Sequence, residues 1–435
     1  MKKQSIWKEI KTKSCPPLTE NIETDVLIIG GGITGMSILY HLKSSNFSVV
    51  LVERNTCGHG VTSKSTAKIT YLQDNTIMNI ANFKTEETAQ KYLESQIHAT
   101  ELLKDIITRE QIDCDLEPAS SYLFTNTKRG VKKLRELKEH LEAVGEVVCD
   151  CQHAPFIEPF TKALKVDDTY VFHPLKHVNF MKEKFSSHIY ENTKVDKIIK
   201  EQDHYIVTAN GHSIRAKRVV LANHYPYFLI PYLFPLKSHI EVSYLGARSV
   251  EQFAPYSAIN IDKPTKSLRF HRGDESDYEL QLLNSYTSCN VANIKSHFEE
   301  LENIGTFDYV WSNNDIITGD YMPYIGPLDA KDKTFLIATG YNTWGMTNAT
   351  LAGELIADIL NDQENEYENL FSPTRLGLSK IIRYPIDLAC SAKAYAISNK
   401  TNPNNKKVIF TKINGQSVAI YEDPNGVKHT VLNRC

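Results

Sequence analysis

A glycine-rich hexapeptide is the segment whose residue types and spacing indicate chemistry most directly. Gly30-Gly31-Gly32-Ile33-Thr34-Gly35 fits the pattern G-x-G-x-x-G, and Glu53 follows Gly35 by 18 residues. Between a strand and a helix, such glycines allow a tight turn and a close approach of the backbone to a pyrophosphate, which the helix N-terminus faces. An acid at the position of Glu53 accepts hydrogen bonds from ribose hydroxyls and disfavours a 2′-phosphate. The pattern predicts a dinucleotide site, and a glycine turn without a ligand is the alternative.

The sequence around the glycines contains the elements that must position them. Residues 25–29 are a β-branched run, residues 33–44 have helical apolar spacing, and residues 48–52 are again typical of a strand. This is the β-turn-α-β order that sets a glycine turn at a helix N-terminus. Leu39 departs from the pattern, because such helices usually carry a small residue where they face the sheet.

Two later segments have the composition to complete such a site. Residues 58–70 are rich in small and hydroxylated side chains, and a loop of this kind can lay N–H groups and hydroxyls along a second phosphate or a flavin ring. A plain polar loop is the alternative. Residues 338–348 contain Gly340 and Gly345 and precede a helix predicted over residues 348–360. A helix N-terminus there offers positive potential to an anionic ring.

The rest of the pattern predicts a mixed chain of helices and strands. Residues 85–110 and 127–144 have the spacing of amphipathic helices. Residues 195–221 are strand-like around the turn Asn210-Gly211, which predicts a β-hairpin. Residues 236–290 alternate strand-like segments with Pro and Asp turns, which predicts a largely antiparallel sheet.

Composition excludes several classes of protein. The 435 residues include 49 Lys and Arg and 52 Asp and Glu, a net charge of −3, and 41% are hydrophobic, which is typical neither of a nucleic-acid binder nor of a disordered chain. No apolar run approaches the ~18 residues of a membrane span, and no apolar core follows the basic N-terminus as in a signal peptide, so we expect a cytoplasmic protein. The polar composition of residues 1–24 predicts an extended arm on the surface, and the composition of residues 399–407 predicts a linker.

Neither of the two candidate metal-ligand spacings predicts a metal site. Cys149-Asp150-Cys151 has no second pair or flanking histidine to complete a zinc set, and the other cysteines are scattered. His173 and His177 have i, i+4 spacing, but we expect Pro174 to disfavour a helical start, and no acid occupies the H-E-x-x-H position. We therefore expect free thiols and no metal.

Seven segments, taken in order, carry a resemblance to a known family. They are residues 5–7, the glycine turn, and residues 61–70, 219–226, 311–312, 320–327 and 338–348. Together they resemble the D-amino-acid oxidase superfamily of FAD-dependent amine and amino-acid oxidoreductases, in the branch similar to gamma-glutamylputrescine oxidase. Many members of that branch carry a C-terminal Rieske iron–sulfur domain.

The resemblance implies a fold that is α/β plus α+β, with a discontinuous Rossmann-like FAD domain and an inserted substrate domain containing a mostly antiparallel sheet. The expected ranges are 1–24 for an N-terminal arm, 25–88, 167–225 and 312–371 for the FAD domain, 89–166 and 226–311 for the substrate domain, 372–406 for a linker, and 407–435 for an incomplete Rieske-like segment. The residues implied to bind FAD, non-covalently, are Gly30, Gly32, Ile33, Thr34, Gly35, Glu53, Arg54, Thr66, Ala67, Lys68, Val195, Ala222, Gly340, Gly345, Met346 and Thr347.

The implied reaction is oxidation of the C–N bond of a small amine or amino acid. The flavin takes a hydride from the carbon bearing a neutral amine, and the resulting imine hydrolyses. His224 and Lys68 are candidates for a catalytic side chain, each with a structural role as the alternative. In place of the branch's glycine-rich stretch with a histidine, residues 280–286 read Leu-Gln-Leu-Leu-Asn-Ser-Tyr. The sequence does not decide whether the electron acceptor is oxygen or another molecule. Three alternative functions also stay open: a nicotinamide-dependent dehydrogenase, an electron-transfer flavoprotein and a binding-only flavoprotein.

The end of the chain resembles the start of a Rieske domain. Residues 407–429 resemble its opening strands, and residues 431–435 resemble the first half of a C-x-H ligand pair. A Rieske centre needs two Cys and two His ligands, and after residue 400 the sequence has Cys435 and His429 alone. We therefore expect no [2Fe–2S] cluster in this chain. In a longer chain we expect a second ligand pair, which would favour an electron relay from flavin to cluster.

Overall fold

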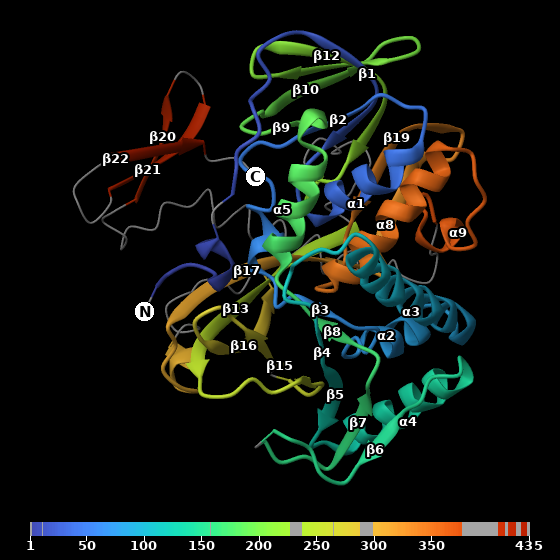
Figure 1. Ribbon diagram of the computed structural model, residues 1–435, viewed down its shortest axis with the longest axis vertical. Helices are drawn as coiled ribbons and strands as arrows, with labels where there is room; N and C mark the ends of the chain where they lie inside the picture. Colours follow the sequence, from blue (N-terminus) through green and yellow to red (C-terminus); the bar gives the residue numbers. More distant parts are fainter. Residues whose placement is uncertain are drawn as a thin grey trace.

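Two eight-stranded sheets dominate the structure (Figure 1). The computed structural model describes residues 2–10, 12–156, 158–226, 237–263, 265–287 and 299–375, and strands over 408–413, 416–422 and 428–432. The expected linker over residues 399–407 lies outside the described residues. The α/β fold with an added antiparallel sheet is confirmed, whereas the division of the chain into domains stays a prediction.

The first sheet is parallel at its centre and antiparallel at one edge. Its strand order is β10 (Val195–Lys200), β11 (Tyr205–Ala209), β12 (His212–Leu221), β1 (Ile22–Ile29), β2 (Val49–Val52) and β9 (Ile189–Tyr190), with β19 (Asp332–Thr339) beside β12 and β18 (Tyr324–Asp329) beside β19. Strand β1 pairs in parallel with β2 and β12, and its residues 26–28 have no exposed surface. Such apolar runs form strands covered on both faces. The turn Asn210-Gly211 joins β11 to β12, so the predicted hairpin is confirmed.

The helices lie beside this sheet and beside the second one (Figure 1). They are α1 (Ile33–His41), α2 (Thr76–Phe83), α3 (Glu86–Arg109), α4 (Lys128–Ala143), α5 (Pro174–Lys184), α8 (Gly345–Leu360) and α9 (Glu368–Phe371), with short 3₁₀ turns η1 (Ile6–Glu9), η2 (Leu42–Ser44), η3 (Val61–Lys64) and η4 (Ser186–His188). Helices α1 and α8 pack closely, because a Cβ at Gly353 would lie 2.1 Å from the Ser37 Oγ. The two amphipathic helices predicted over residues 85–110 and 127–144 are confirmed as α3 and α4.

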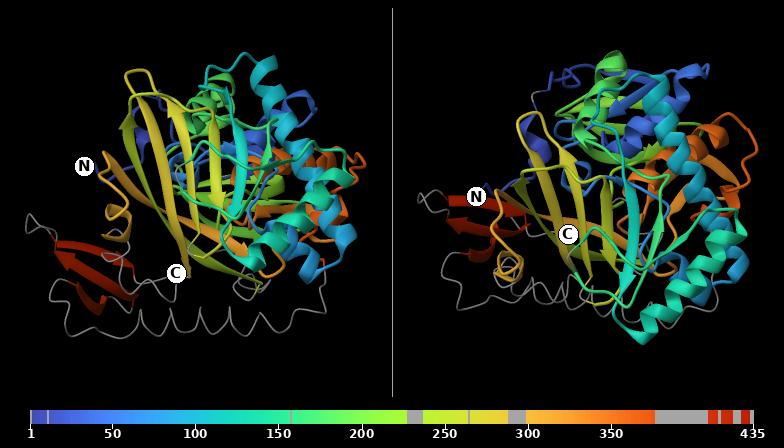
Figure 2. Two further views of the ribbon diagram at one scale, coloured as in Figure 1. Left: turned by 90° about the horizontal axis from the view of Figure 1, so that it is seen from below. Right: turned by 60° about the horizontal axis from the view of Figure 1, so that its bottom comes forward.

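The second sheet is antiparallel at every pairing except that of β14 with β5 (Figure 2). Its order is β17 (Tyr309–Thr318), β13 (Ser238–Val250), β16 (Asp277–Thr287), β15 (Lys266–Arg272), β14 (Tyr256–Asn260), β5 (Ser120–Thr125), β7 (Lys162–Val166) and β6 (Cys149–Cys151). The largely antiparallel sheet predicted for residues 236–290 is therefore confirmed. Two three-stranded sheets complete the fold: β3 (Lys68–Ile69) with β8 (Tyr170–Val171) and β4 (Glu117–Pro118), and β20 (Val408–Ile413) with β21 (Gln416–Glu422) and β22 (Lys428–Leu432).

The N-terminal segment is anchored more firmly than the surface arm that its polar composition predicts. Trp7 in η1 has no exposed surface, and its Nε1 donates to the backbone oxygen of Ser65 at 2.8 Å. The rings of His173 and His271 pack edge-on against Trp7, at centroid distances of 4.9 and 4.8 Å. The prediction fails at Ile6, Trp7, Cys15 and Leu18, which are buried, whereas most of the other described residues of the segment are exposed.

The expectation that Pro174 disfavours a helical start is also wrong, because α5 begins at this residue. Proline suits the first position of a helix, where its missing N–H has no partner to lose. His173 caps the helix, since its Nδ1 accepts from the backbone N–H of Lys176 at 3.2 Å. His177 is buried on the same helix, and desolvation lowers its pKa to about 4.

The described residues contain neither the side-chain cluster of a metal site nor a membrane-spanning helix. In that part of the chain, no group of three or more His, Cys, Asp and Glu side chains has the arrangement of a metal site. Nor does any described helix combine the length and the apolar composition that a bilayer span requires.

Candidate functional site

A cavity of about 650 Å³ extends from the carboxyl ends of β1, β2, β12 and β19 to one face of the second sheet. Ligand sites in open α/β sheets lie at the carboxyl ends of the strands. The volume is that of a site for a small molecule or cofactor. Among the candidate residues, it is lined by Gly30, Gly32, Ile33, Thr34, Glu53, Arg54, Thr66, Lys68, Val195, Ala222, His224, Gly340, Gly345 and Met346. Gly35, Ala67 and Thr347 do not line it.

The glycine turn is built as its spacing predicts. Gly30 has φ +117°, and a Cβ there would lie 2.6 Å from the backbone oxygen of Ala222. At Gly35 a Cβ would lie 1.9 Å from the backbone oxygen of Gly30, so this glycine allows the helix to pack on the strand. Gly32 precedes the first residue of α1 and carries no capping side chain, while the N–H of Ile33 donates to Thr62 Oγ1 at 3.1 Å. The helix N-terminus therefore faces the cavity with its positive potential.

Glu53 stands at the end of β2 and is tied to the glycine turn. Its Oε2 accepts from the N–H of Gly31 and its Oε1 accepts from the N–H of Asn55, both at 2.8 Å. Each carboxylate oxygen has more than one lone pair, so both can also accept from a ligand hydroxyl. Val195, 4% exposed, lines the same end of the cavity.

The segment after η3 brings a buried amine to the cavity. The Nζ of Lys68 lies 2.5 Å from Ser267 Oγ, and the residue is 7% exposed. Burial, together with the charge of Arg269, lowers the pKa of Lys68 to about 7, and Asp74 acts in the opposite direction. Burial likewise raises the pKa of Asp74 to about 6. Asp74 and Arg269 are thus charged neighbours of Lys68 that the sequence alone did not identify.

The second glycine segment closes the cavity from the side of α8. Gly340 has φ +75°, and a Cβ there would lie 2.4 Å from the Thr318 Cγ2. Helix α8 begins at Gly345, three residues before the predicted start, without a capping side chain. Thr347 lies inside the helix and donates to Gln96 Oε1 at 2.8 Å, so it supports the segment from behind.

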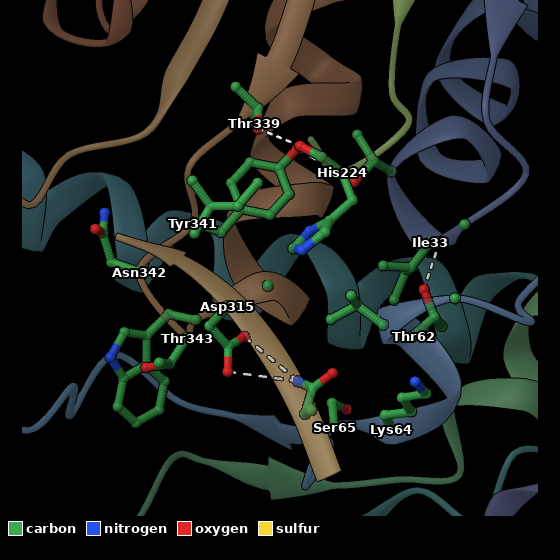
Figure 3. A pocket seen from close by; sticks show the side chains of 18 of the residues that line it. Ile33, Thr62, Lys64, Ser65, His224, Asp315, Thr339, Tyr341, Asn342 and Thr343 are labelled. Atoms are coloured by element: carbon green, nitrogen blue, oxygen red, sulfur yellow. Dashed lines mark hydrogen bonds between the residues drawn. The ribbon is translucent and has the colours of Figure 1, made fainter. Parts of the chain in front are cut away.

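His224 occupies the end of β12 in a left-handed conformation, with φ +65°. Its backbone oxygen accepts from the Thr339 hydroxyl, and burial lowers the pKa of its imidazole to about 4. Figure 3 shows His224, Asp315 and Lys64 around the same space. At neutral pH the His224 imidazole is uncharged.

Three polar side chains on the cavity wall were not predicted from the sequence. Asp315 and Asn313 on β17 and Glu241 on β13 line the part formed by the second sheet. The polar run over residues 312–315, between apolar residues of β17, is the signal that would have pointed to Asp315. Glu241 has no comparable signal, because its role depends on the pairing of β13 with β17.

The comparisons with known proteins agree with this geometry. A sequence profile described as FAD dependent oxidoreductase (DAO) matches residues 25–359, most of the chain. The chain belongs to this family. As an FAD-dependent oxidoreductase, it requires a site for FAD, and the cavity described above meets the carboxyl ends of the sheet where such a site lies.

Relatives and solved structures support the same assignment. The chain is 28% identical over 458 residues to YhfW of Bacillus subtilis (strain 168), whose name describes a Rieske 2Fe-2S iron-sulfur protein; the match covers 99% of this chain and 89% of YhfW. It is 25% identical over 376 residues to gamma-glutamylputrescine oxidoreductase of Escherichia coli (strain K12), covering 81% and 87%. Glycine oxidase from Geobacillus kaustophilus superposes with a TM-score of 0.64 at 19% identity, covering 81% of this chain and 99% of that one.

The residues present fit FAD. The glycine turn leaves a concave space in which side chains at these positions would clash with the backbone. Two buried polar atoms also line the cavity without a hydrogen-bond partner in the described part of the protein: Asn223 Nδ2 and Trp344 Nε1. Buried polar groups are normally satisfied, so these atoms are free to bind a ligand. The absence of an iron–sulfur cluster stays a prediction: His429 lies in β22, and Cys435 lies outside the described residues.

Proposed function

We propose that this chain oxidises the C–N bond of an amine or amino acid, giving an imine that hydrolyses. The observation that supports this most is a single cavity that joins the glycine turn of the first sheet to an enclosed face of the second sheet. FAD, when bound, supplies the hydride acceptor. The names of the E. coli relative and of the similar glycine oxidase concern amine and amino-acid oxidation, which agrees with this proposal.

We assign to Lys68 the role of the base that accepts a proton from the substrate's ammonium group. A pKa of about 7 leaves much of its amine uncharged at neutral pH, so that it can accept a proton from a substrate ammonium. Ser267 fixes the direction of the amine by its hydrogen bond. His224 is less suited to this task, because its imidazole has a pKa of about 4. As a base it would be weak at neutral pH.

The N-terminus of α8 has an electrostatic role in the same proposal. Its first turn, from Gly345, carries no acidic residue and no capping side chain. Its partial positive charge therefore stabilises negative charge that develops in the cavity during reaction. Met346 and Trp344 are nearly buried beside it and keep water from that charge.

The test is an absorption spectrum followed by an anaerobic screen. Purified protein should be yellow, and an amine from a panel of amino acids, N-methyl amino acids and polyamines should bleach the flavin without oxygen. Bleaching by reduced nicotinamide alone would instead identify a nicotinamide-dependent enzyme. If no amine bleaches the flavin, the protein binds FAD without this activity and the proposal fails.

The similarity to YhfW favours a second candidate for the electron acceptor, a Rieske cluster in a longer chain. Oxygen consumption during turnover distinguishes the two. Consumption of about one oxygen per amine oxidised supports an oxidase, whereas a reduced flavin that persists in air supports electron transfer to another acceptor.

A further inference from the structure

Two carboxylates face each other across the β13–β17 pair, inside the cavity. Glu241 and Asp315 are direct cross-strand partners in the ladder. Opposed residues of an antiparallel pair have Cβ atoms about 4.5–5.5 Å apart, and like charges placed there destabilise a sheet. Both side chains line the cavity, so the unfavourable pair lies where a ligand binds.

The surroundings of Asp315 do not neutralise it. The residue is 9% exposed, and its hydrogen bonds come from Asn313 Nδ2, at 3.4 and 3.5 Å. Within the described part of the chain it has no ion-pair partner. Burial and the charge of Glu241 raise the pKa of Asp315 to about 7. A buried charge without a partner is costly, and a cation placed beside it would remove that cost.

Within the described residues, no Lys, Arg or His side chain forms an ion pair with Asp315. Glu241 is bonded to His239, whose Nε2 lies 3.2 Å from the Glu241 Oε1. Lys64, Lys68 and Lys263 also line the cavity, and none of them is among the charges that shift the pKa of Asp315. Among the described residues, no cation therefore compensates the charge of Asp315.

A separate polar atom points to the same kind of ligand. Asn313 is 6% exposed and lines the cavity, and its Oδ1 has no hydrogen-bond partner among the described residues. Its Nδ2 faces Asp315, so the amide presents its free acceptor to the cavity. A free acceptor beside two carboxylates suits a ligand that only donates, such as an ammonium group.

The described lining offers a substrate carboxylate one arginine beside its lysines. Arg54 is the one arginine among the described lining residues, and it follows Glu53 at the end of the cavity near the glycine turn. The guanidinium of Arg269 donates to backbone oxygens of Ala67 and Phe172 and does not line the cavity. Arginine is the side chain that pairs best with carboxylates.

We propose that Asp315, Glu241 and Asn313 form a cation subsite that holds a second ammonium group of the substrate, so that the cavity takes diamines or polyamines in preference to amino acids. The proposal rests on the proposed amine oxidation and adds the substrate class to it. Asp315 and Glu241 set specificity by charge, and Asn313 accepts one hydrogen bond from the ammonium.

Three ligands of equal chain length test the subsite on the FAD-loaded protein. 1,4-Diaminobutane, n-butylamine and 4-aminobutanoate differ at one end, which is an ammonium, a methyl or a carboxylate group. Anaerobic calorimetric titration and the concentration dependence of flavin bleaching give their affinities. We expect the diamine to bind most tightly and 4-aminobutanoate most weakly.

Variants assign the preference to these residues. Asp315→Asn should weaken binding of 1,4-diaminobutane by roughly 10- to 150-fold, since hydrogen bonds to charged groups contribute about 1.5–3 kcal/mol, and should change n-butylamine binding much less. Glu241→Gln should act in the same direction. Glu251→Gln, an exposed acid that follows β13, is the matched control and should leave all three affinities unchanged. FAD content and thermal melting establish that each variant is folded.

The outcomes separate this proposal from the amine oxidation on which it rests. If the diamine binds in a way that depends on Asp315 but no amine bleaches the flavin, the cation subsite is supported and the proposed amine oxidation is refuted. If amino acids bleach the flavin and 4-aminobutanoate binds as tightly as 1,4-diaminobutane or more tightly, the proposed oxidation is supported and the cation subsite is overturned. The subsite is also overturned if the wild-type protein binds none of the three ligands, or if Asp315→Asn weakens the diamine and n-butylamine equally.

Discussion

Replacing Lys68 with methionine should stabilise the protein at neutral pH, by an amount that falls as the pH rises. Methionine keeps an unbranched apolar side chain but removes the buried amine. Burial and Arg269 lower the pKa of Lys68 from 10.5 to about 7. Since one pKa unit corresponds to about 1.4 kcal/mol, folding disfavours the ammonium form by about 5 kcal/mol relative to the unfolded chain.

The sign of the pH dependence follows from the two pKa values. Between about 7 and 10.5, the unfolded chain keeps a proton on Lys68 that the folded chain has released. The free energy of unfolding of the wild-type protein therefore rises with pH in this window. Below pH 7 the penalty is fully present, so the advantage of Lys68→Met should shrink by about 2–3 kcal/mol from about pH 7 to about pH 9. Asp74, with a pKa of about 6, is already ionised in this range.

Urea unfolding of FAD-saturated protein at several pH values measures this difference. The exposed Lys331→Met variant is the control and should track the wild type at every pH. The rate of flavin bleaching gives a second readout: Lys68→Met should lower it by about 10²–10⁴-fold and abolish its rise through pH 7. A stability difference between wild type and Lys68→Met that is constant from pH 7 to 9 would refute an uncharged Lys68 in the folded protein. An unchanged bleaching rate would refute its role in proton transfer.

Four further outcomes are expected. Glu53→Gln should weaken FAD binding by about 10- to 150-fold in titrations of the apoprotein, and an unchanged affinity would show that this carboxylate does not face the ribose. Gly35→Ala should yield protein without bound FAD, judged by the flavin absorbance, because the added Cβ would lie 1.9 Å from the Gly30 oxygen. Trp7→Ala should lower the free energy of unfolding by about 3–5 kcal/mol, whereas a loss below ~1 kcal/mol would mean that the N-terminal segment is not anchored. Acid precipitation should leave the yellow colour in the supernatant, and colour in the pellet would contradict non-covalent FAD.

Local sequence was sufficient for the features that local geometry decides. The turn Gly30 to Gly35 was predictable because only glycine fits a positive φ or so close a backbone contact. Helices α3 and α4 follow from apolar periodicity, and the β11–β12 hairpin follows from Asn210-Gly211, which suits a tight turn. In each case the residues that determine the structure lie within one element or one turn.

Tertiary structure decided the features that depend on distant segments. The acidic pair exists because the register of β13 on β17 places Glu241 opposite Asp315, and no local pattern specifies that register. Lys68 becomes a weakly basic amine because Ser267, Arg269 and the second sheet enclose it. Trp7 is buried because His173, which caps α5, and His271 of β15 meet around it. The sequence by itself thus determined the family and the nucleotide turn, whereas desolvation and cross-strand pairing, which arise only on folding, decided the charge of the cavity wall.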